Sequence, residues 1–155
     1  MPSLAGSLDW AAAARILAAL ALAFNALPVQ AEAPLKTLPL RIASHALKVE
    51  VAESPPAREK GLMFREKLAA NDGMLFIFDE PGYHSMWMMN TLIPLSVAFV
   101  DGGGKILSIH EMQPRTTDTH TAAGPARYAI ETNAGWFAKK KIKPGDTVTG
   151  LPKVK

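Results

Sequence analysis

The chain has 155 residues, no cysteine, and a formal net charge of +3 from 17 basic and 14 acidic side chains. The absence of cysteine excludes disulfide bonds, thiol catalysis and thiolate metal ligands. The length is that of one domain with a short additional segment. About 120 residues are enough to bury a single hydrophobic core without covalent support.

The first 31 residues have the pattern of a secretory signal. Arg15 supplies a positive charge, residues 16–27 form an apolar run broken only by Asn25, and Val29-Gln30-Ala31 provides the cleavage pattern. We therefore expect cleavage after Ala31 and a periplasmic or secreted mature protein. A retained membrane anchor is the alternative, but a span needs about 20 apolar residues, and Arg15 interrupts any longer run. No membrane span is expected after cleavage.

Residues 32–37 are predicted to be a tether, and residues 38–155 are predicted to be one β-rich domain. Alternating or unbroken apolar runs predict strands, and glycine- or proline-containing turns separate them. The predicted strands are residues 38–43, 46–52, 74–78, 83–90, 95–100, 105–112, 127–132 and 147–151. One short helix is predicted between Ser54 and Gly61, and a second over residues 134–139 with Asn133 as its cap. Residues 113–125 are predicted to form the one long loop.

The arrangement of these elements indicates the fold class. Long amphipathic helices do not alternate with the strands, so a parallel βαβ sheet is disfavoured. We expect an all-β fold with one or two short helices. It should be a single domain, either a β-sandwich or a closed barrel.

Five ordered motifs resemble those of the DUF192 family, which consists of small, often exported proteins. They are Glu59-Lys-Gly-Leu-Met-Phe-Arg65, Asp72-Gly-Met-Leu-Phe-Ile-Phe78, Trp87-Met-Met-Asn-Thr-Leu-Ile-Pro-Leu95, Ile130-Glu131 with Ala134-Gly135, and Gly145-Asp146. The similarity extends over roughly residues 40–150 of the chain. The resemblance implies a compact, mostly antiparallel β-sandwich of jelly-roll type, and it implies no assigned activity.

Two positions depart from the pattern that the resemblance implies. The family commonly has Lys at the position of Met89 and Asp at the position of Ser96. If those two residues were functional, this chain has lost both, which argues against a catalytic role for either. Alternatively the two residues form an ion pair in other members, so that one is lost only together with the other.

Polar and aromatic residues gather in the centre of the sequence and suggest a binding site. Trp87, Asn90 and Thr91 lie beside an apolar strand, and Arg65 follows the first helix. Tryptophan together with amide and guanidinium groups is typical of a concave site for a small polar or sugar-like ligand. We therefore predict a ligand-binding patch of Arg65, Trp87, Asn90 and Thr91, with Glu131 at its edge. The alternative is that Trp87 belongs to the core and the polar residues order a bend.

Two other functions have weaker support from the sequence. His84, Met86 and Met88 alternate along a predicted strand, and imidazole with thioether ligands suits Cu(I), although methionines also fill gaps in cores. A small hydrolase would need a nucleophile with a base or a pair of carboxylates, and no motif marks either. The four carboxylates considered fall in separate motifs; they are Glu59, Asp72, Glu131 and Asp146. We assign no catalytic residue, no metal ligand and no cofactor.

The basic cluster near the C-terminus is interpreted as a solvated face. It consists of Lys139, Lys140, Lys141 and Lys143 and accounts for much of the sequence pI of about 9.3. Export argues against nucleic acid as a partner. The sequence therefore predicts an exported, monomeric, non-enzymatic module that binds a small molecule or a component of the cell envelope.

Overall fold

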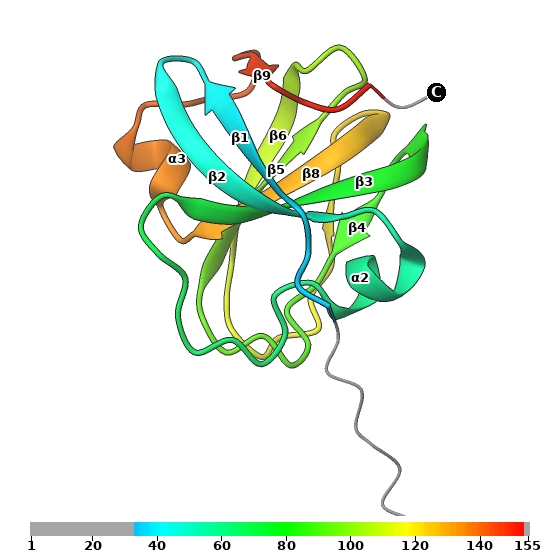
Figure 1. The fold of residues 1–155 in the computed structure, drawn as a ribbon, viewed down its shortest axis with the longest axis vertical. Helices are drawn as coiled ribbons and strands as arrows, with labels where there is room; N and C mark the ends of the chain where they lie inside the picture. Colours follow the sequence, from blue (N-terminus) through cyan, green and yellow to red (C-terminus); the bar gives the residue numbers. More distant parts are fainter. Residues whose placement is uncertain (1–32, 154–155) are drawn as a thin grey trace, which may run out of the picture. The chain divides into compact units, whose positions relative to one another are not determined.

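The structure is a computed structural model that describes residues 33–153, and residues 34–153 belong to one compact unit. The predicted secretory signal lies outside the described residues. The unit contains a seven-stranded sheet and a two-stranded sheet (Figure 1). Among residues 33–153, no helix is long and apolar enough to cross a membrane.

The elements follow the chain in a simple order. The seven strands of the main sheet are β1 (Thr37–Ile42), β2 (His45–Ala52), β3 (Asp72–Gly82), β5 (Leu95–Val100), β6 (Ile106–Met112), β8 (Ala126–Asn133) and β9 (Val148–Thr149). The small sheet pairs β4 (Ser85–Met86) with β7 (His120–Thr121). Two short helices complete the fold, α2 (Pro55–Lys60) and α3 (Trp136–Lys139). The prediction of a β-rich domain with two brief helices is confirmed.

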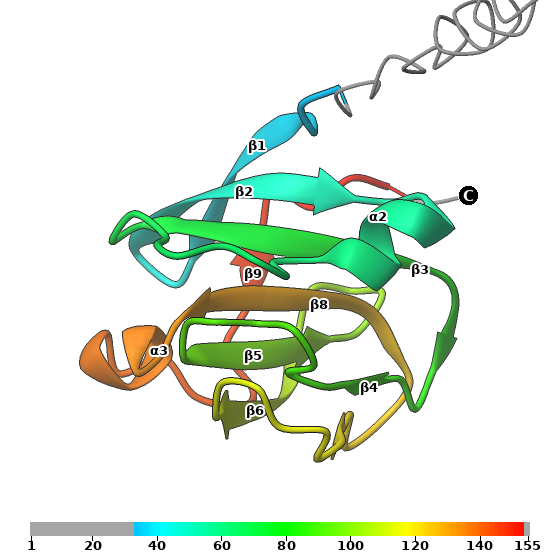
Figure 2. The ribbon, with the colours of Figure 1, turned by 90° about the horizontal axis from the view of Figure 1, so that it is seen from below.

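The main sheet is curled, and hydrogen bonds connect its two ends. The strand order is β6-β5-β8-β3-β2-β1-β9, which Figure 2 shows as a succession from β1 and β2 through β3, β8 and β5 to β6. At the far ends, Lys105 forms a bridge with Thr147, and the amide of Gly145 donates to the carbonyl of Ile106 at 2.8 Å. The seven strands therefore form one curled sheet. The expected barrel-like arrangement describes this sheet better than a sandwich of two stacked sheets.

One pair of strands departs from the antiparallel expectation. β2 and β3 are parallel, whereas the other neighbouring pairs of the two sheets are antiparallel. Parallel neighbours need a crossover of a dozen or more residues, and the segment from Glu53 to Asn71, which contains α2, supplies it. The expected antiparallel arrangement therefore has one exception, because a short helix with its flanking segments is enough to build this crossover.

The core consists of two clusters on opposite faces of the curled sheet. The first fills the inside of the curl and includes Val49, Leu75, Ile130 and Phe137. The second covers the other face of β3, β5 and β8; it includes Ala57 and Leu62 from the first helix and the segment after it, together with Phe76. The helix and the small sheet therefore act as a second layer over one face, and the candidate site lies within this layer.

Helix α2 is positioned by the residues that the sequence marked. The side chain of Ser54 accepts a hydrogen bond from the amide of Ala57 at 3.3 Å, and Pro55 occupies the first turn, where its missing amide costs nothing. Gly61 ends the helix with a φ of +47°. A Cβ atom at Gly61 would lie 3.2 Å from the ring of Phe76, so glycine also permits the close approach of this turn to β3.

Three local predictions are wrong. The strand predicted over residues 83–90 is limited to Ser85–Met86, and the predicted long loop contains β7. The second helix has Gly135 rather than Asn133 at its cap. The Asn133 side chain instead donates to the carbonyl oxygens of Leu68 at 3.1 Å and Ala69 at 3.0 Å. In each case, a tertiary contact overrides a local preference.

Candidate functional site

A pocket of about 240 Å³ opens on the face of the sheet that α2 and β4 cover. Its walls come from α2 and the residues after it, from β3 and β8, and from the segment that begins with β4. The lining residues are Arg58, Glu59, Lys60, Gly61, Leu62, Met63, Phe76, Phe78, Ser85, Met86, Trp87, Thr91 and Glu131. We call this the carboxyl pocket, because Glu131 is the one buried acidic residue among residues 33–153.

Glu131 is held in an apolar setting by its position in the sheet. It lies in β8 between Met74 of β3 and Val97 of β5, and its exposed fraction is 4%. No residue between 33 and 153 forms an ion pair or side-chain hydrogen bond with its carboxyl group. Every fully buried side-chain oxygen in that part of the chain has a hydrogen-bond partner. Since the Glu131 carboxyl oxygens have no such partner, they are not fully buried and are accessible from the pocket.

Burial raises the pKa of Glu131 to about 8. The cause is the loss of solvent around the carboxylate, since transfer of an unpaired charge into an apolar site is costly. The side chain is therefore mostly protonated at neutral pH. A carboxyl group with a strongly perturbed pKa in a cleft is a common property of binding and catalytic sites.

Trp87 and Thr91 share the pocket with Glu131. Trp87 is 46% exposed, so the alternative that it belongs to the core is excluded. Thr91 is buried, and its hydroxyl donates to the Met89 carbonyl at 3.4 Å. Three of the five predicted site residues therefore line one cavity, although their role in binding stays a prediction.

Arg65 and Asn90 do not line the pocket. The guanidinium of Arg65 forms two hydrogen bonds of 2.6 Å with the Glu50 carboxylate on β2, and this contact lowers the pKa of Glu50. The two segments nevertheless meet, because the Phe64 amide donates to the Asn90 carbonyl at 2.9 Å. The segment after α2 therefore packs against the segment that contains Asn90, as expected. The Arg65 side chain points toward Glu50 on β2 and not into the pocket.

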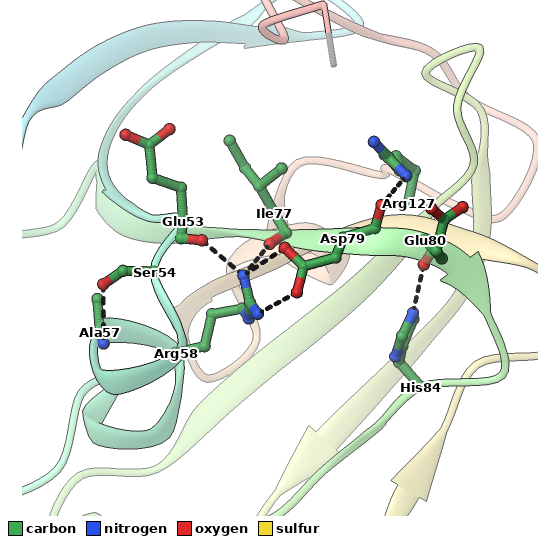
Figure 3. Close-up of polar contacts among 9 residues, drawn as sticks. All are labelled: Glu53, Ser54, Ala57, Arg58, Ile77, Asp79, Glu80, His84 and Arg127. Carbon is green, nitrogen blue, oxygen red and sulfur yellow. Dashed lines mark hydrogen bonds and ion pairs between the residues drawn. The ribbon is translucent and has the colours of Figure 1, made fainter. Parts of the chain in front are cut away.

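Hydrogen bonds and an ion pair with neighbouring segments compensate the positive charge of Arg58, which lies at the edge of the pocket. Figure 3 shows its guanidinium among hydrogen-bond acceptors of three residues, Glu53, Ile77 and Asp79. It donates to the carbonyl of Glu53 at 2.6 Å and to the carbonyl of Ile77 at 2.9 Å, and it pairs with the Asp79 carboxylate at 2.7 Å. These bonds fix α2 against β3 and leave the pocket without a strong positive field from this residue.

The structure brings together two carboxyl groups that belong to separate motifs in the sequence. Glu59, on α2, and Glu131, on β8, both line the carboxyl pocket. Glu59 is exposed, whereas Glu131 is buried. The sequence offered no signal that these two residues would share a pocket, because only the packing of a helix on a sheet places them there.

The proposed copper ligands on residues 83–90 do not form a common site. The His84 ring nitrogen Nε2 lies 2.8 Å from the Glu80 carbonyl, and the ring stacks on Phe78 at 3.7 Å (Figure 3 shows the His84 contact with Glu80). Met88 is completely buried in the core, whereas Met86 lines the pocket. The alternation on which the hypothesis depended ends at Met86, because the strand ends there.

One of the two departures from the family pattern lies away from the pocket. The hydroxyl of Ser96 is fully buried and donates to the Glu111 carboxylate at 2.7 Å, and the amide of Gly135 donates to Ser96 Oγ at 2.8 Å. Ser96 alternates with Val97, which faces the second core cluster. A carboxylate is thus present beside position 96, but it comes from the neighbouring strand and faces away from Glu131.

The fold and the pocket define a small β-rich protein with one protonated carboxyl group in a mostly apolar cavity. The chain belongs to the DUF192 family, described as "Uncharacterized ACR", whose profile matches residues 38–150. The resemblance inferred from the five motifs is confirmed. None of the curated proteins with which the chain was compared matches it.

Two solved structures resemble this chain closely in fold. A protein from Sinorhizobium meliloti 1021, described provisionally as a transcription regulator, is 36% identical with a TM-score of 0.74, over 77% of this chain and 98% of that one. A protein of unknown function from Novosphingobium aromaticivorans DSM 12444 is 34% identical with a TM-score of 0.72, over 79% of this chain and 89% of that one.

Proposed function

We propose that this chain is an exported, non-enzymatic protein that binds a small molecule in the carboxyl pocket. The observation that supports the proposal best is Glu131, whose carboxyl group is buried and unpaired yet reaches the space of the pocket. A buried polar group without a partner is costly, and a ligand that supplies the partner recovers that cost. Folded proteins keep such groups mainly where a ligand or a reaction uses them.

The lining favours a small amine with an apolar body. An ammonium group would pair with the Glu131 carboxylate and offset the desolvation that raises its pKa, because an opposite charge stabilises the ionised form. The half-exposed indole of Trp87 offers a face for a cation. Met63, Phe76 and Phe78 provide apolar walls, which suit a hydrocarbon body better than a sugar. The volume of about 240 Å³ is below the range usual for drug-sized ligands.

Binding is tested with two ligands of the same shape and different charge. We expect benzylamine to raise the melting temperature of the purified protein at neutral pH, since a ligand that binds only the folded state stabilises it. Benzyl alcohol should raise it much less, because it has no charge to pair with Glu131. The measurement is a thermal-shift titration with both compounds over the same concentration range.

Glu131→Gln is the matched variant for this experiment, because it keeps the shape of the side chain and removes its ability to ionise and pair with an ammonium group. The variant should lose the preference for the amine. Trp87→Ala should weaken the response to both compounds, whereas Tyr83→Ala should change neither, since Tyr83 is 68% exposed and lies outside the lining. Equal shifts with the two compounds in the wild type, or an unchanged preference in Glu131→Gln, would contradict the proposal.

Export is part of the proposal and is supported by the leader pattern of residues 1–31. Protein recovered from the periplasm is expected to begin at Glu32, because Val29-Gln30-Ala31 precedes the expected cleavage point. The intact mass of that protein is the measurement. Recovery of the full-length chain in the cytoplasm alone would contradict export without affecting the pocket.

Hydrolysis is the second candidate, and the presence of both Glu59 and Glu131 in the lining of one pocket favours it. A protonated carboxyl group can act as a general acid, and glycosidases combine such a group with a second carboxylate. Turnover of aryl glycosides or esters that is lost in both Glu131→Gln and Glu59→Gln would replace the binding proposal with an enzymatic one.

A further inference from the structure

Two histidines and a methionine come together from three separate strands beside the carboxyl pocket. Met86 on β4 and His120 on β7 lie directly opposite each other. Residues opposed in this way project to the same face with Cβ atoms about 4.5–5.5 Å apart. The ring of His120 lies 5.8 Å from the ring of His110 on β6, measured between centroids. His120 is therefore a neighbour of both Met86 and His110.

The three side chains are held in place by packing. Each is half-buried. Met86 packs against the second core cluster, and the His110 ring meets the ring of Phe99 edge-on at 5.8 Å between centroids. Side chains ordered in this way before binding lose less conformational entropy when they take up a ligand.

The His110 ring lies beside a hydroxyl group of its own strand. Its Nε2 lies 3.2 Å from Ser108 Oγ. Ser108 Oγ also accepts a hydrogen bond from the Ala123 amide at 3.3 Å. A metal ion bound to His110 Nε2 would therefore break only one of these two contacts of Ser108 Oγ.

We propose that Met86, His110 and His120 bind one Cu(I) ion. Imidazole and thioether ligands suit this soft ion, whereas carboxylate ligands favour harder ones. Among residues 33–153, no group of three or more His, Cys, Asp or Glu residues could hold a metal. The cluster therefore lacks the additional nitrogen, oxygen or thiolate ligands that a tetrahedral zinc site needs.

The metal site and the amine site share Met86 but differ in their charged groups. Glu131 and His110 both pair with Val97, one from each side. Since neighbouring strands are about 4.8 Å apart, one strand separates the two groups by roughly 10 Å. Met86 contributes to both places, whereas Glu131 belongs to the pocket alone. Glu131→Gln should lose the preference for the amine and keep Cu(I) uptake, so it separates failure of the amine proposal from failure of the metal proposal.

The test is a titration of the purified protein with Cu(I) under anaerobic conditions, in competition with a colorimetric Cu(I) chelator. The wild type should take up a single equivalent. His120→Gln and Met86→Leu should lose this uptake, and Met86→Leu keeps the apolar volume. Addition of Ag(I), a diamagnetic substitute, should shift the ring NMR signals of His110 and His120 and leave those of His45 and His84 unchanged.

The remaining two histidines provide matched controls. His84→Gln and His45→Gln should retain uptake, and so should Glu131→Gln. Circular dichroism establishes that each variant is folded, and if His110→Gln does not fold, the His120 and Met86 variants decide the outcome. The proposal is wrong if the wild type takes up no more Cu(I) than His120→Gln, if His84→Gln abolishes uptake, or if Zn(II) binds the same residues more tightly.

Discussion

Replacement of Phe76 with alanine should lower the free energy of unfolding by about 3–5 kcal/mol, the usual loss for a fully buried aromatic side chain. Phe76 is 1% exposed and lies in β3, beneath the turn at Gly61 that ends α2. The substitution removes the ring against which this turn packs, so the cavity would extend to the carboxyl pocket that Phe76 lines. Urea denaturation at neutral pH, with the slope compared between variants, measures the loss.

Phe64→Ala is the matched control, because it removes the same side chain from a position that is 65% exposed. Its effect should stay within about 0.5 kcal/mol, as is usual for surface substitutions. A loss below about 1 kcal/mol for Phe76→Ala would mean that β3 does not carry the core. A change of the denaturation slope rather than the midpoint would point to an altered denatured state.

The stability of the protein should fall as the pH rises, because of Glu131. The pKa of its carboxyl group is about 8 in the folded chain, against an ordinary value of 4.5 for a glutamate side chain. Between these values, the folded state binds more protons than the unfolded state, so the free energy of unfolding decreases with pH. The contribution is complete below about pH 4.5 and is lost as the pH rises through 8. At about 1.4 kcal/mol per pKa unit, the total loss is on the order of 5 kcal/mol.

Glu131→Gln isolates this effect from those of other groups. His110 contributes with the opposite sign, because its pKa is lower in the folded protein than in the unfolded chain. Its contribution makes the free energy of unfolding rise with pH near the ordinary histidine pKa of 6.5. This contribution is present in both proteins and cancels in their difference. Denaturation at a series of pH values between about 5 and 8 should therefore show a decline in the wild type relative to Glu131→Gln. Parallel curves would mean that Glu131 is ionised at neutral pH and solvated.

Local sequence patterns were sufficient to predict the elements whose tertiary packing favours the same structure as their local preference. The alternation of Leu47, Val49 and Val51 predicted β2, and all three residues are buried. Ser54, followed by proline, predicted the start of α2, and Gly61 predicted its end. These predictions succeeded because each element places its apolar residues on the face that the sheet buries, so local preference and tertiary packing favour the same structure.

Local patterns failed where a contact from a distant segment decides the backbone. Residues 83–90 alternate like a strand, but the strand ends at Met86 because Met88 turns into the core, and the amide of Met88 donates to the Thr116 carbonyl at 3.2 Å. Asn133 was expected to cap a helix, yet its side chain binds the carbonyls of residues 68 and 69. A strand pattern contains no information about such partners.

The sequence by itself determined the family, the β-rich class, most strand positions and the approximate region of the site. These follow from apolar periodicity and ordered motifs, which are local properties. Only the tertiary structure decided that Glu131 is a buried carboxyl group, that Arg65 pairs with Glu50 outside the pocket, and that Met86 lies near His110 and His120. The physical reason is that burial and side-chain proximity depend on which strands become neighbours, and in this chain a parallel crossover and a small second sheet make that choice.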